Sequence, residues 1–103
     1  MTEKEIKQLL NSSGIPFRYH HWKTRKRPPF GVYLFPESKN LMADGIVYYK
    51  SNALQIELYT EEKKPETEEA LENVLDQAGF FYDKTEDYLQ SEGLYQVTYE
   101  MEM

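Results

Sequence analysis

LYQVTYEMEM, residues 94–103, alternates apolar and polar side chains almost without interruption. The apolar set falls on one face and consists of Tyr95, Val97, Tyr99, Met101 and Met103. A period of two over this length is typical of a half-buried antiparallel strand. We therefore expect these residues to form a sheet strand that turns its apolar side chains toward the core.

The segment before this strand predicts a helix and a short strand. Pro65 suits the first turn of a helix, and Gly79 is a favoured residue just beyond a helix end. The apolar stripe between them consists of Ala70, Leu71, Val74, Leu75 and Ala78. Residues 80–84 indicate a strand, residues 85–87 a turn, and residues 88–90 the start of the last strand, with a bulge at 91–93.

Further toward the N-terminus, residues 46–50 and 54–60 indicate a hairpin that turns at Ser51 and Asn52. Residues 37–45 indicate a loop that is long for a chain of this size, and its Leu41 and Met42 have no evident core to join.

The first 36 residues predict one helix and two strands. Thr2 and Glu5 fit a capping box ahead of an apolar stripe made by Ile6, Leu9 and Leu10. Residues 17–22 and 31–35 indicate strands. The expected order is therefore α-β-β-β-β-α-β-β, an α+β fold in which a mostly antiparallel sheet carries two helices on one face. At 103 residues, we expect residues 1–103 to form a single domain.

The charge is distributed unevenly along the chain. Residues 1–52 carry nine Lys or Arg and four Asp or Glu, whereas residues 53–103 carry three Lys and fourteen Asp or Glu. The net charge is -6, and a net acidic domain is repelled by nucleic-acid phosphates unless its cations gather on one face. Four cations do gather in one segment, KTRKRPP at residues 23–29, which we call the basic loop.

The basic loop is the main candidate interface in the sequence. Its cations and the aromatic residues that flank it are Trp22, Lys23, Arg25, Lys26, Arg27 and Phe30. Aromatic side chains beside cations can stack on bases. Because the rest of the chain is acidic, we expect the loop to contact an acidic protein surface, with nucleic-acid binding as the alternative.

No residue pattern indicates catalysis, a metal site or a cofactor. The two histidines, His20 and His21, are adjacent, and neighbouring strand residues point to opposite faces. The acidic cluster at residues 61–69 lacks the spacing of a calcium loop. The chain contains no cysteine, no glycine-rich phosphate loop and no nucleophile motif, so we expect a protein that is not an enzyme. Residues 1–10 lack the apolar run of a signal peptide or membrane span, and we expect synthesis in the cytoplasm without membrane contact.

Four segments of the second half resemble small tail-completion proteins of long-tailed phages and prophages of Gram-positive bacteria. They are QIELYT at 55–60, the acidic helix that ends at 75–79, FFYDKTEDY at 80–88 and GLYQVTYEMEM at 93–103. The resemblance covers residues 46–103, and the first part of the chain is similar in style more than in motif.

The resemblance implies a tail terminator or head–tail joining protein with an α+β fold. Such proteins form rings, typically of six subunits, that meet the tail tube protein and the head connector protein. DNA passes through such a ring without being read, and the expected location is the host cytoplasm during assembly and then the virion tail or neck. A minor capsid or neck connector protein and a small nucleic-acid-binding regulator are the alternatives. Leu41 and Met42 are the expected docking residues of the loop at 37–45, which we expect to become ordered only on a partner.

Overall fold

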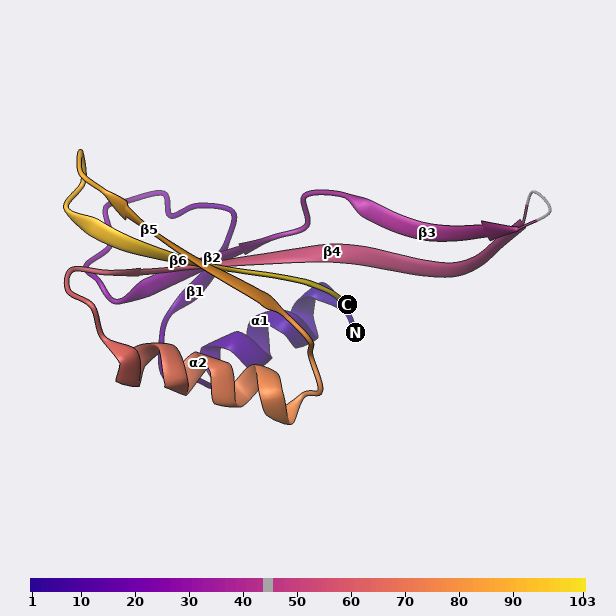
Figure 1. Cartoon of the computed structure of the whole chain (residues 1–103), viewed down its shortest axis with the longest axis horizontal. Helices are drawn as coiled ribbons and strands as arrows, with labels where there is room; N and C mark the ends of the chain where they lie inside the picture. The colour runs from indigo at the N-terminus through magenta and orange to yellow at the C-terminus, as the bar shows by residue number, and fades with distance from the viewer. Residues whose placement is uncertain (44–45) are drawn as a thin grey trace.

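The computed structural model describes residues 1–43 and 46–103, and for residues 39–43 and 46–51 it describes the backbone alone. The chain has an α+β fold with the predicted order of elements (Figure 1). The elements are α1 (Glu3–Asn11), β1 (Phe17–Tyr19), β2 (Phe30–Leu34), β3 (Ser38–Ala43), β4 (Ile46–Thr60), α2 (Pro65–Gln77), β5 (Asp83–Leu89) and β6 (Leu94–Glu102).

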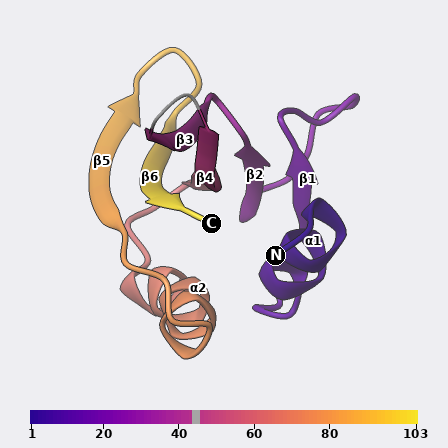
Figure 2. The same cartoon turned by 90° about the vertical axis from the view of Figure 1, so that its right-hand side faces the viewer.

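Five strands form a sheet in the order β1-β2-β4-β6-β5, and β3 pairs with β4 outside this path. The β1–β2 pair is parallel and every other described pair is antiparallel. Both helices lie under the same face of the sheet, with α1 near β1 and α2 near β5 (Figure 2). No described helix covers the opposite face, which we call the open face.

The core lies between the helices and the sheet, and β6 supplies the side chains that its alternation predicts. Val97, Tyr99 and Met101 are buried, while Met103 packs against the core and Tyr95 is half-buried. From the helices, Ile6 and Leu10 of α1 and Leu71 and Leu75 of α2 complete this layer.

Local sequence signals explain both helix starts. The Thr2 hydroxyl accepts a hydrogen bond from the Glu5 amide at 3.2 Å, and the Glu5 carboxylate accepts one from the Thr2 amide at 3.0 Å, so the predicted capping box forms. Pro65 is the first residue of α2, as expected, whereas its N-cap residue Lys64 makes no side-chain cap. Gly79 follows α2 with a φ of +82°, a conformation that glycine adopts at little cost.

The predicted hairpin at residues 46–60 is wrong. Residues 46–60 form one continuous strand, β4, so Ser51 and Asn52 are strand residues instead of a turn. The predicted loop at 37–45 is also wrong for residues 38–43, which form β3 and pair with β4; residues 44–45 lie outside the described residues. The dipeptide Asp44-Gly45 is a strong hairpin signal in the sequence and would have predicted that the segments before and after it pair.

Two further strand boundaries differ from the prediction. The strand predicted at 80–84 lies at Asp83–Leu89, so residues 85–87 are strand and residues 88–90 do not begin the last strand. Charged residues there resemble a turn, but an edge strand accommodates them because both its faces reach solvent. The strand predicted at 17–22 ends at Tyr19, because His20 has a left-handed φ of 63°.

Candidate functional site

The two edges of the sheet carry opposite charge. Residues 1–29, which build α1, β1 and the basic loop, contain seven Lys or Arg and two Glu. Residues 61–93, which build α2, β5 and the turn after it, contain three Lys and eleven Asp or Glu. Because β1 and β5 are the first and last strands of the sheet path, most of this charge difference lies across the width of the molecule, while Glu61, Glu62 and Glu92 line a groove beside the basic loop.

The basic loop is anchored by Trp22 on the open face. The Trp22 indole Nε1 donates a hydrogen bond to the Gly31 carbonyl at 3.1 Å, and its ring lies edge-on to Phe30. Phe30 in turn stacks on Tyr59 with 5.0 Å between ring centroids. Lys26 Nζ lies 5.0 Å from the Trp22 centroid, a cation–π distance. Trp22 and Phe30, two of the predicted interface residues, therefore hold the loop in place.

All four cations of the basic loop are exposed. Within the described part of the chain, no carboxylate forms an ion pair with Lys23, Arg25, Lys26 or Arg27. A groove of about 900 Å³ runs beside the loop, and Glu61, Glu62 and Glu92 lie on its lining together with Arg25 and Lys26. The groove thus combines both signs of charge.

The two histidines do not point to opposite faces, as the strand prediction had required. The left-handed turn at His20 brings the two Nδ1 atoms to 3.2 Å, with the rings edge-on. One imidazole nitrogen must donate and the other accept at this distance. Among the residues that the structure describes, no group of three or more His, Asp or Glu side chains could hold a metal ion.

An ion-pair network connects β5 to α2 on the helix face of the sheet. The Glu68 carboxylate accepts hydrogen bonds from Lys63 and Lys84, each at 2.7 Å. Lys84 also contacts Glu72 at 2.7 Å, and Lys63 contacts Glu86 at 2.5 Å. Glu72 accepts a further hydrogen bond from the buried Tyr99 hydroxyl at 2.8 Å.

Glu68 is 3% exposed, and its ionisation depends on these lysines. Burial alone would raise the pKa of Glu68, but the hydrogen bonds from Lys63 and Lys84 outweigh burial and lower that pKa. The hydrogen bonds that Lys63 donates to Glu68 and Glu86 raise the pKa of Lys63. Burial, followed by the hydrogen bond to Glu72, raises the pKa of Tyr99. This network has a structural role, because its charged groups are paired with one another.

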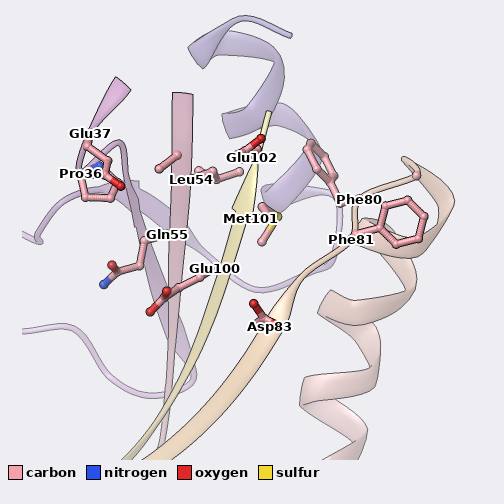
Figure 3. A pocket seen from close by; sticks show the side chains of 12 residues that line it. Pro36, Glu37, Leu54, Gln55, Phe80, Phe81, Asp83, Glu100, Met101 and Glu102 are labelled. Atoms are coloured by element: carbon pink, nitrogen blue, oxygen red, sulfur yellow. The ribbon is translucent and has the colours of Figure 1, made fainter. Parts of the chain in front are cut away.

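Carboxylates gather on the open face near β5. Asp83 of β5 lies directly opposite Glu100 of β6, and Asp87 lies four residues further along β5 on the same face. A hollow of about 510 Å³ lies here, lined by Asp83 and Glu100 together with residues of β4 and the 36–37 segment (Figure 3). Phe81, also on its lining, is 95% exposed.

The third candidate surface is a two-stranded arm, residues 38–52. β3 pairs with the first part of β4 and with no other described strand, and the pair projects beyond the rest of the sheet (Figure 1). Leu41 and Met42, the predicted docking residues, lie in β3 opposite Tyr49 and Val47, where the register shifts by a bulge. The longest dimension of the molecule is 50 Å, and the arm runs along it.

The sequence predicted the basic loop and pointed to residues of the arm, but it missed the acidic surface on β5 and β6. The arm and the basic loop lie toward opposite ends of the long axis, so the structure does not bring the predicted site residues together (Figure 1). Asp83 and Glu100 are 17 positions apart in a chain rich in acids, and only the strand register places them opposite each other. No helix in the described part of the chain is long and apolar enough to cross a membrane.

Comparison with known proteins gives no relative: no family model matches the sequence, and no curated protein matches it.

Proposed function

We propose that this chain is a structural ring subunit that completes a phage tail and joins it to the head connector, and that it acts without catalysis. The observation that carries the proposal is the opposite charge of the two sheet edges. In a cyclic ring each subunit uses two different patches, one toward each neighbour. A cationic edge and an anionic edge on opposite sides of one sheet meet this requirement.

The arm supplies a second kind of contact. A ring that caps a tube must bind something above or below its own plane in addition to its neighbours. The arm leaves the sheet along the long axis of the molecule, whereas the charged edges face sideways (Figures 1 and 2). An isolated two-stranded ribbon has little stability of its own in water, so contact with a partner would stabilise it. We assign the arm to the tail tube protein or the head connector protein.

The net charge of -6 agrees with a ring through which DNA slides, because a net acidic subunit is repelled by phosphates. A minor capsid or neck connector protein of the same ring type would use the same surfaces. A nucleic-acid regulator is less well supported, because the Trp22 ring is engaged by Lys26 and Phe30.

Light scattering on the chain alone and on the chain mixed with tail tubes tests the proposal. We expect the free chain to be monomeric, since the net charge of -6 makes copies repel at long range, and to form rings on tube ends. The triple variant Arg25→Ala, Lys26→Ala and Arg27→Ala should lose ring formation. Failure of the wild type to bind tail tubes or connectors would exclude the proposal. Tight, salt-sensitive DNA binding in a gel shift, lost in the triple variant, would favour the regulator instead.

A further inference from the structure

We propose that the basic loop of one copy docks on the acidic edge of the next copy, and we define the acidic edge as Asp83, Asp87 and Glu100 on the open face. The inference rests on the proposed function, because it names the contact that joins neighbouring ring subunits.

Two carboxylates of the acidic edge repel each other. Asp83 and Glu100 are direct cross-strand partners, and like charges in this position destabilise a sheet. Within the described residues, no Lys or Arg forms an ion pair with Asp83, Asp87 or Glu100. A cation that arrives from another molecule would therefore relieve repulsion in addition to forming its own contact.

The β5 strand leaves this surface accessible. β5 pairs with β6 alone, so the backbone groups on its other side have no strand partner within the described sheet. Natural proteins often protect such an edge with an outward lysine. Lys84, the lysine of β5, instead binds Glu68 and Glu72 on the helix face.

The basic loop has the matching chemistry. Arg25, Lys26 and Arg27 are exposed and consecutive, and two of the three are arginines. The planar guanidinium group donates two parallel hydrogen bonds to a carboxylate, and the acidic edge offers three carboxylates. Trp22 and Phe30 hold the start and end of the loop against the sheet, which lowers the entropy lost on docking.

Position excludes docking of this loop on the acidic edge of its own chain. The loop connects β1 and β2 at one side of the sheet, whereas β5 is the strand at the other side. The acids that the loop does approach within its own chain are Glu61, Glu62 and Glu92 across the groove. The contact with Asp83, Asp87 and Glu100 must therefore come from a second copy, in a head-to-tail arrangement.

Engineered cysteines test the contact directly, because the chain contains no cysteine. Thr24→Cys lies in the loop and Thr85→Cys lies on β5 between Asp83 and Asp87, so neither removes a charge. We expect the two single variants, mixed in the presence of tail tubes and oxidised, to form a disulfide-linked pair in at least about fivefold excess over Thr24→Cys mixed in the same way with Asn73→Cys, an exposed control on α2. Equal yields would overturn the proposal.

The double variant Thr24→Cys and Thr85→Cys tests the direction of assembly. Head-to-tail contacts should give a ladder of covalent products larger than two copies on a denaturing gel. Products that stop at two copies would show a symmetric pair and would overturn the head-to-tail arrangement.

Charge reversal tests the electrostatic origin. Arg25→Glu, Lys26→Glu and Arg27→Glu on the Thr24→Cys chain should abolish cross-linking to Thr85→Cys, and Asp83→Lys with Asp87→Lys on the Thr85→Cys chain should restore it. The pair Glu66→Lys and Glu69→Lys changes the net charge equally, and it should restore nothing. Restored cross-linking with this control would show that net charge alone is responsible, and it would overturn the assignment of the contact to the β5 carboxylates. If cross-linking fails while the wild type still forms rings on tail tubes, the contact is wrong and the proposed function stands.

Discussion

Glu68 is the buried charge on which the junction of α2 and β5 depends. Its carboxylate joins Lys63 and Lys84, so the substitution Glu68→Gln would leave two ammonium groups without their shared acceptor. We expect a loss of about 1–3 kcal/mol in the free energy of unfolding, less than for a fully buried pair because the lysines are partly exposed. Urea denaturation measures it. The neighbouring exposed change Glu69→Gln should stay within about 0.5 kcal/mol of the wild type, and equal effects of the two changes would contradict the role of the network.

The same carboxylate predicts an acid-dependent loss of stability. The pKa of Glu68 is lower in the folded chain than its ordinary value of 4.5, so the unfolded chain binds this proton more readily. The stabilisation is complete above about pH 4.5 and is lost as the pH falls through the folded pKa. Thermal melts from pH 7 downward should therefore show a smaller difference between wild type and Glu68→Gln at low pH. A difference that stays constant would show that Glu68 does not titrate as described.

Single residues show where the sequence was informative. The capping box of Thr2 and Glu5 depends on neighbours along the chain, and it formed as predicted. His20 could not be predicted, because its left-handed backbone is rare for a non-glycine residue. That conformation ends β1 and brings the two imidazoles together.

Among the elements, β6 provides the clearest stability test. Val97 is 2% exposed, and Val97→Asp would place an unpaired carboxylate in the core. The cost is several kcal/mol, on the order of the whole stability of a small domain, so we expect circular dichroism to show an unfolded chain at room temperature. Thr98→Asp, one residue along on the open face, is the matched control and should remain folded. An unchanged melt for Val97→Asp would contradict the packing of β6.

In β5, one substitution should stabilise the isolated subunit and weaken its association with other copies. Asp83→Lys would replace the like-charge pair with Glu100 by an opposite-charge pair, which favours the isolated subunit by about 0.2–1 kcal/mol. The same change would remove one carboxylate from the acidic edge. We expect a slightly higher melting temperature together with weaker cross-linking of the Thr24→Cys and Thr85→Cys chains. Stabilisation with unchanged cross-linking would show that the Asp83 carboxylate takes no part in the contact.

The fold class and the order of the elements were predicted correctly, but residues 38–60 were assigned to the wrong elements, for physical reasons. β6 and α2 have strong apolar periods because each buries one face, and these elements lie where the sequence placed them. β3 and β5 lack such a period: β5 is exposed along nearly its whole length, and β3 pairs with a single strand. Burial is the signal that periodicity reports, so elements that bury little leave a weak pattern. The acidic edge was missed for the same reason.

At the scale of the whole molecule, the arm can be tested apart from the fold. The Ala53 amide donates a hydrogen bond to the Glu37 carbonyl at 2.9 Å, so the chain ends on either side of the arm are adjacent. Replacing residues 38–52 with Asn-Gly should therefore preserve the core, because that dipeptide closes a two-residue hairpin. We expect a cooperative melt close to that of the wild type and loss of binding to tail tubes in co-sedimentation. Tube binding by the shortened chain would exclude the arm as the docking element.

The 15-residue length of β4 gives the arm a mechanical property. β4 forms one side of the arm and then, without a break, the middle strand of the sheet between β2 and β6. A force applied along the arm would load the hydrogen bonds to both neighbours in parallel, as shear, instead of opening them one after another like a zipper. The arm is therefore well placed to transmit tension from a bound partner to the sheet.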